Sequence, residues 1–224
     1  MNWSGNGNTG TLTNGPTWTT GGKYGSAVSL DGVDDLINLG SGATLNDLAS
    51  STYSFWINPT ALATARNLYS KPANSGNTQN FFHTGPTASD ELRVRVGQST
   101  TATEFVTSNA NLMTGTWWFV AVTYDDTSTP RHRIYVGDSV TSATERTYGL
   151  TDNGAGTKNP DSANQLIIGN ALAGTSGFNG LIDNLRIYRR VLNTTEIQTD
   201  QNTPVGGLMA AYGLNEVSGT TAAD

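Results

Sequence analysis

Apolar and polar residues alternate along much of this 224-residue chain, in short runs that end at Gly, Pro, Asn or Asp. A period of two places successive side chains on opposite faces of a β-strand. The run at residues 52–59 ends at Pro59, which cannot donate a ladder hydrogen bond. Similar runs predict strands at residues 26–32, 35–40, 66–72, 79–85, 91–98, 103–108, 164–170 and 180–190.

The longest alternating run, residues 116–126, is followed after a short polar turn by another at residues 131–138. The two predict a β-hairpin joined across residues 127–130. Helical signals are confined to two short segments, residues 46–50 and 192–200. In the second, Asn193 stands three residues before Glu196, the spacing of a capping box.

A dozen short strands with almost no helix predict an all-β fold, two antiparallel sheets packed face to face. Only 13% of the residues are charged, while Gly, Thr, Asn and Ser are abundant, which is typical of many strands joined by tight turns. No linker divides the chain, so residues 1–224 are expected to form a single domain. Without cysteine, disulfides are excluded.

Charge and hydropathy exclude several classes of protein. The net charge of −6, with only three lysines, argues against a nucleic-acid partner. No apolar run reaches the ~20 residues of a membrane-spanning helix, and no signal peptide precedes Asn2. A single Met before a polar segment is interpreted as the start of an excised piece of a larger protein.

The segment GKYGSAVSLDGVDD resembles the pattern G-K-x-G-x-A-x-x-F-D-G-x-D-D of laminin-G-like, concanavalin A-like jelly rolls in large bacterial surface and polysaccharide-processing proteins. Leu30 replaces the usual Phe. Residues 114–126 and 178–197 resemble two further blocks of that family. The resemblance implies a jelly-roll β-sandwich in an extracellular or cell-surface protein of a bacterium, and it implies little about function. The matching positions are Gly22, Lys23, Gly25, Ala27, Asp31, Gly32, Asp34 and Asp35.

The C-terminal residues 207–224 resemble the strand that normally comes first in this family. The chain is therefore interpreted as a permuted copy of the fold or as a window cut from tandem repeats; the alternative is that its two ends are unrelated. We expect residues 207–216 to form an inner strand of their own sheet, with Asp224 near Trp3. The same strand could instead complete a neighbouring molecule in a strand-swapped oligomer.

Asp183 stands in an otherwise apolar strand, where an inward carboxylate needs a partner. Calcium, which takes ~6–8 oxygen ligands, suits that position. The family resemblance implies a structural calcium held by Asp183, Asp31, the carbonyl of Gly32 and Asn6. The alternative is an outward Asp183 in water beside a plain Asp-Gly turn.

Glucanases share this fold, so catalysis needs a separate test. Their chemistry requires two carboxylates about 5–5.5 Å apart, which on a strand means acidic residues at alternate positions. None of the five glutamates has such a neighbour, and neither a Ser-His-Asp arrangement nor a zinc pattern is present. The sequence therefore predicts a non-enzymatic protein.

Sugars bind to aromatic platforms flanked by planar hydrogen-bonding groups. Trp118 is such a platform or else part of a second core layer, while the family resemblance makes Trp117 a core residue. The predicted function is that of a calcium-stabilised glycan- or surface-binding module, expected to be monomeric; the alternative is a purely structural spacer. The other candidate ligand-binding residues, which could equally be solvated outer positions, are Tyr69, Lys71, His83, Arg93 and Arg95.

Overall fold

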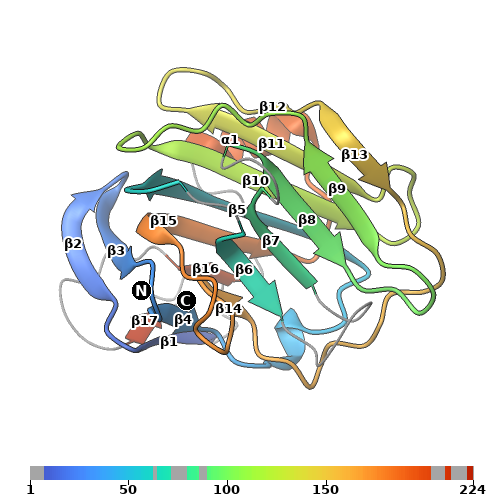
Figure 1. The fold of residues 1–224 in the computed structure, drawn as a ribbon, viewed down its shortest axis with the longest axis horizontal. Helices are drawn as coiled ribbons and strands as arrows, with labels where there is room; N and C mark the ends of the chain where they lie inside the picture. Colours follow the sequence, from blue (N-terminus) through green and yellow to red (C-terminus); the bar gives the residue numbers. More distant parts are fainter. Residues whose placement is uncertain are drawn as a thin grey trace.

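The computed structural model describes residues 8–62, 65–71, 80–85, 90–202, 210–212 and 221–223. Two antiparallel sheets pack face to face, which confirms the predicted β-sandwich (Figure 1). In sheet A the strands follow the order β13 (Tyr148–Asp152), β9 (Thr103–Thr107), β8 (Leu92–Val96), β7 (Asn80–Thr84), β6 (Asn67–Lys71), β14 (Ile167–Ile168), β4 (Leu36–Asn38), β1 (Thr9–Thr13) and β17 (Thr221–Ala223).

Sheet B contains the longest strands. Its order is β12 (Thr144–Glu145), β11 (His132–Asp138), β10 (Trp118–Asp125), β5 (Ser50–Pro59), β15 (Asn179–Tyr188), β3 (Gly25–Asp31) and β2 (Thr17–Gly22). A further strand, β16 (Ala210–Tyr212), pairs with β15. The alternating runs thus form strands, and β10 and β11 form the predicted hairpin. The sequence pattern did not predict the edge strands β2, β12 and β13, nor β1, which lies between β4 and β17.

The main core lies between the sheets. Alternate residues of facing strands contribute its largest rings, Phe55, Phe82 and Phe105, none of which is exposed to solvent. Burying a side chain of this size stabilises the fold by roughly 1.5–3 kcal/mol. The inner faces of the two sheets are therefore fixed by period-two patterning.

Helix α1 (Thr194–Asn202) covers the outer face of sheet B (Figure 1). Its Ile197 packs into a second apolar cluster with Trp56, Phe119 and Tyr188. The predicted capping box is confirmed, because Asn193 Oδ1 accepts from the N–H of Glu196 and Glu196 Oε2 accepts from the N–H of Asn193, both at 2.9 Å. Among the described residues, no helix has the length and apolar character needed to cross a membrane.

The helical turn predicted at residues 46–50 lies elsewhere. The structure has a 3-10 turn, η1 (Ala43–Leu45), and Asn46 is already extended. Asp47 follows with a left-handed φ of 53°, and its carboxylate accepts a 2.6 Å hydrogen bond from the N–H of Asp161. That tertiary contact ends the helical turn.

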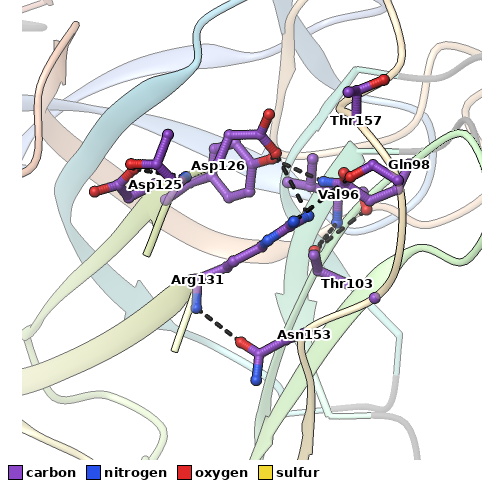
Figure 2. Close-up of polar contacts among 12 residues, drawn as sticks. Val96, Gln98, Thr103, Asp125, Asp126, Arg131, Asn153 and Thr157 are labelled. Carbon is purple, nitrogen blue, oxygen red and sulfur yellow. Dashed lines mark hydrogen bonds and ion pairs between the residues drawn. The ribbon is translucent and has the colours of Figure 1, made fainter. Parts of the chain in front are cut away.

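Polar contacts tie the β10–β11 hairpin to neighbouring segments (Figure 2). Gln98 donates to the hydroxyl of Tyr124 at 2.8 Å, and that hydroxyl donates to Asp126 at 2.6 Å. The backbone N–H of Arg131 donates to Asn153, whose side chain reaches the start of β11 at 2.9 Å. These contacts satisfy buried polar groups at one end of the sandwich.

Candidate functional site

The outer face of sheet A carries a row of large polar and aromatic side chains on β7 and β8. Phe82 and Val94 point into the core. By alternation, their neighbours Phe81 and Arg95 point outward. Phe81 pairs with Arg95, and His83 with Arg93, in adjacent positions of the two strands.

These outward side chains line a cavity of ≈ 330 Å³, which we name the Phe81 pocket. Its floor comes from β6, β7 and β8, and its opposite wall comes from the segment at residues 171–176. Of the candidate residues from the sequence, the structure brings together His83, Arg93 and Arg95. The described residues of the lining are Ala65, Asn67, Ser70, Asn80, Phe81, His83, Arg93, Arg95, Ala171, Thr175 and Ser176.

Aromatic stacking fixes the centre of the Phe81 pocket. The rings of Phe81 and His83 are stacked with their centroids 4.6 Å apart and an interplanar angle of 25°. The guanidinium carbon of Arg93 lies 5.3 Å from the Phe81 centroid, within cation–π range. Arg93 also forms an ion pair with Glu104 at 2.7 Å.

The charge of the pocket is positive. Burial lowers the pKa of His83 to about 4, so this imidazole is neutral at pH 7. The described lining contains the two arginines and no Asp or Glu. Glu104, beside the pocket, offsets Arg93.

The predictions for Tyr69 and Lys71 as ligand-binding residues are wrong. The pairing of β6 with β7 shifts register between Asn67 and Tyr69, and this bulge turns Tyr69 to the inner face beside Leu68. Tyr69 stacks on Tyr53 with centroids 4.3 Å apart. Lys71, two residues further, also points inward and is only 2% exposed.

Trp118 belongs to the core between the sheets, as the alternative interpretation had it, and the prediction of a binding platform there is wrong. Its side chain is 8% exposed and packs with Val120 and Val122. The indole N–H donates to the carbonyl of Met113 at 3.1 Å. Trp117 packs on the other face of the strand, against the cluster under α1.

The residues predicted to bind calcium are not assembled as one set. Asp183 is buried and accepts a 2.8 Å hydrogen bond from the N–H of Tyr24, just before β3 begins. Asp31, in contrast, ends β3 and pairs with Asn179. The two aspartates therefore lie at opposite ends of β3, and Asn6 lies outside the described residues.

Burial raises the pKa of Asp183 to about 6, although the N–H groups of the adjoining turn and the charge of Arg186 act in the opposite direction. The partner that this carboxylate needs is thus supplied in part by the backbone of the β2–β3 turn. Its second oxygen, Oδ1, is buried and makes no hydrogen bond with the described residues.

A different acidic cluster forms at the end of β3. Ligand atoms of Asp31, Asp34 and Asp35 all lie within 4.8 Å of one another. Burial raises the pKa of Asp35, and the nearby charges of Asp31 and Asp34 raise it further, against the 2.9 Å hydrogen bond from the N–H of Asp31. Three carboxylates at this spacing match the oxygen donors that calcium prefers.

Gly32 shapes the turn that carries this acidic cluster. Its φ of +81° is unfavourable for other residues. Gly177 approaches so closely that a Cβ there would lie 2.7 Å from the carbonyl carbon of Gly32. Two glycines therefore hold the acidic turn against the loop that precedes β15.

Sequence reasoning missed several residues of the Phe81 pocket. Phe81 itself was detectable, because period two places it on the same face as His83. Asn67 and Ser70 were not, since the bulge in β6 breaks the alternation. The wall at residues 171–176 comes from a loop distant in sequence, and no local pattern places it on sheet A.

Comparison with solved structures places this fold among known jelly rolls. Domain 4 of AbnA, a GH43 extracellular arabinanase from Geobacillus stearothermophilus, in complex with arabinotriose, matches with a TM-score of 0.54 and 18% identity, over 85% of this chain and 87% of that one. The CBM40 of Ruminococcus gnavus IT-sialidase, bound to alpha2,3 sialyllactose, matches with 0.54 and 16%, over 77% and 95%.

Tailspike protein 2 from the Escherichia coli O157:H7 bacteriophage CAB120 matches with a TM-score of 0.68 and 11% identity. The match covers 98% of this chain but only 31% of the tailspike. At these identities the three likenesses show a shared fold. A search of curated proteins found no similar sequence.

The sequence profile of one family matches residues 30–198, most of the chain. That range contains both the acidic turn after β3 and the strands that form the Phe81 pocket. Together with the two-sheet architecture, the match confirms the resemblance seen in the sequence motifs. The chain belongs to the concanavalin A-like lectin/glucanases superfamily.

Proposed function

We propose that this domain binds glycans, without catalysis, through the Phe81 pocket. The observation that carries the proposal is the half-buried Phe81 ring, stacked on His83 inside a pocket lined by arginine, amide and hydroxyl groups. Aromatic faces pack against the C–H face of a sugar ring, while planar polar groups bind its hydroxyls. A pocket of ≈ 330 Å³ has room for one or two sugar rings.

Two structural relatives support this choice of ligand. The arabinanase domain is in complex with arabinotriose, and the CBM40 is bound to alpha2,3 sialyllactose. Both are of similar size to this chain, since the matches cover 87% and 95% of their lengths. The family itself includes both lectins and glucanases.

A non-catalytic role follows from the charges at the pocket. A retaining glycosidase needs two carboxylates about 5–5.5 Å apart across the scissile bond. The described lining of the Phe81 pocket has none, and Glu104 is held by Arg93. Incubation with arabinan, β-glucan, chitin and alginate should therefore release no reducing sugar above a protein-free control.

Calcium is proposed as a structural ion at the acidic turn of Asp31, Asp34 and Asp35, where the donor chemistry fits. This turn joins β3 to β4, and Asn14 on the β1–β2 loop donates to the carbonyl of Asp34 at 3.0 Å. An ion there would reduce the repulsion among three carboxylates.

The setting is proposed to be an extracellular or cell-surface protein of a bacterium, with this domain as one monomeric module. The extracellular arabinanase, in which a domain of this fold accompanies an enzyme, supports that setting. The acidic chain, at −6, argues against nucleic acid as a partner.

The decisive experiment is affinity electrophoresis through gels that contain neutral or acidic polysaccharides. The wild-type protein should be retarded by at least one of them. The variant Phe81→Ala should lose that retardation, while Leu150→Ala, an exposed apolar residue on β13, should keep it. Equal melting temperatures of the variants would show that Phe81→Ala remains folded.

The rival function is a spacer that holds other modules apart. A spacer is retarded by no polysaccharide, and its mobility is insensitive to Phe81→Ala. Either result would overturn the proposal.

A further inference from the structure

The Phe81 pocket is a positively charged site on an acidic protein. Its described lining includes Arg93 and Arg95 and no carboxylate, although acidic residues outnumber basic ones by 18 to 12 in the sequence. A neutral sugar requires no net charge from its site. The two arginines therefore help to identify which kind of glycan the pocket binds.

Of the two arginines, Arg93 alone has an ion-pair partner among the residues that the structure describes. Arg95 stands directly opposite Glu104 in the pairing of β8 with β9, where an ion pair would be expected. Glu104 instead binds Arg93 at 2.7 Å, two positions along the strand. Among the described residues, Arg95 is left without an ion pair.

Arg95 also has an unused hydrogen-bond donor. Its Nε is buried from solvent and has no acceptor among the described residues. A buried guanidinium N–H without an acceptor is costly, and such groups in folded proteins usually have a partner. A bound ligand with an oxygen acceptor would satisfy the Nε of Arg95.

The immediate surroundings favour a flat anion attached to a ring. Phe81 pairs with Arg95 in the register of β7 and β8, so the aromatic face and the guanidinium are neighbours. The fork of a guanidinium binds the two oxygens of a carboxylate in one plane. His83, stacked on Phe81 and neutral, adds no competing charge.

We propose that the Phe81 pocket selects acidic glycans, with the carboxylate of a uronic or sialic acid residue bound by Arg95 and the sugar ring against Phe81. This inference rests on the proposed glycan-binding function and gives it a substrate class. Arg93, held by Glu104 and by the Phe81 ring, positions the aromatic platform.

The test uses three matched pairs of oligosaccharides: trigalacturonate, trimannuronate and sialyllactose, each beside the same compound with its carboxyl groups reduced to alcohols. Titration calorimetry on the full chain should show at least one acidic member bound about tenfold or more tightly than its reduced partner, as expected for a charge-assisted pair. Rising sodium chloride should reduce this preference.

The variant Arg95→Gln should abolish the preference, so that the acidic compound binds no more tightly than its reduced partner. Arg189→Gln removes the same charge from an exposed position after β15 and should behave as wild type. Unchanged melting temperature of Arg95→Gln would confirm that the loss is local.

Equal affinity within every pair, or a preference that survives Arg95→Gln, would overturn the carboxylate assignment while glycan binding stands. Tighter, Arg95-dependent binding of a sulfated galactotriose than of any uronate would also overturn it, in favour of sulfate esters. Failure to bind any acidic or neutral glycan would overturn the proposed function and this inference together.

Discussion

The ammonium group of Lys71 lies 2.6 Å from Oδ1 of Asp161, and both side chains are almost entirely buried. Lys71 also donates to the carbonyl of Leu45 at 2.8 Å and to Oδ1 of Asn46 at 2.7 Å, so all of its donors are used. Burial lowers the pKa of Lys71, and Asp161 partly restores it. The pair fastens the η1 turn to the inner face of sheet A.

The first prediction follows from a second cation at this site. Lys158 also pairs with Asp161, so Lys71→Met leaves the carboxylate neutralised, whereas Asp161→Asn removes the ion-pair partner of two ammonium groups. Removing one member of a buried pair costs about 3–5 kcal/mol of the free energy of unfolding. We expect that loss for Asp161→Asn and a smaller one for Lys71→Met, measured by urea denaturation at neutral pH. Equal losses would contradict it.

Lys71 also shows a limit of prediction from the sequence. The strand was predicted from the short run at residues 66–72, which ends at Pro72. Which side chains face out was not, because one extra residue near Leu68 shifts the register and turns Tyr69 and Lys71 inward. The bulge therefore decides which residues of this strand can contact a ligand.

The acidic residues also show what a local sequence pattern can and cannot predict. Asp183, in its apolar strand, was predicted to need a partner, and a backbone N–H of the β2–β3 turn binds one of its two carboxylate oxygens. A local sequence pattern shows that a buried carboxylate needs a partner, but it does not identify that partner. In contrast, the crowding of Asp31, Asp34 and Asp35 was visible in sequence because all three lie in one turn.

The second prediction concerns acid sensitivity. Burial lowers the pKa of His132 to about 3 and that of His83 to about 4, from a usual value of 6.5. Between pH 6.5 and these lowered pKa values, the unfolded chain binds protons that the native state does not. The free energy of unfolding should therefore keep its full value above pH 6.5. At lower pH it should decrease, by up to about 1.4 kcal/mol per pH unit for each histidine.

Asp183 acts in the opposite sense. Its pKa is raised from 3.8 to about 6, so the native state binds its proton more tightly and gains stability as the pH falls through that window. Urea denaturation across this pH range should give a shallower slope for His132→Gln and a steeper one for Asp183→Asn than for wild type. Identical slopes for all three proteins would refute the assignment.

The third prediction concerns the C-terminal strands. Residues 210–212 of β16 pair with Leu185, Arg186 and Ile187 of β15, and residues 221–223 of β17 pair with β1. Truncation after Asn202 would leave the backbone groups of β15 and β1 unpaired at these positions, which favours aggregation. The truncated chain should melt at lower temperature, and a peptide of residues 203–224 should restore it.

The expected oligomeric state follows from the same pairing. A chain that uses its own β16 should sediment as a monomer. A stable dimer that dissociates on addition of the peptide would mean that the strand is swapped between molecules. A truncated monomer with unchanged melting temperature would show that the strand adds no stability.

The last prediction decides between two positions for calcium. If the ion lies at the acidic turn, EDTA should lower the melting temperature, and a hundredfold excess of calcium over its dissociation constant should restore ~2.7 kcal/mol. Asp34→Asn removes one carboxylate of the cluster and should abolish the response to calcium. Asp183→Asn keeps an oxygen acceptor for the Tyr24 N–H and should retain that response. The opposite pattern, loss with Asp183→Asn and retention with Asp34→Asn, would move the ion to Asp183. Equal melting of the wild-type protein with and without EDTA would remove calcium from both positions, and the three aspartates would then form a turn without a bound ion, whose shape depends on Gly32.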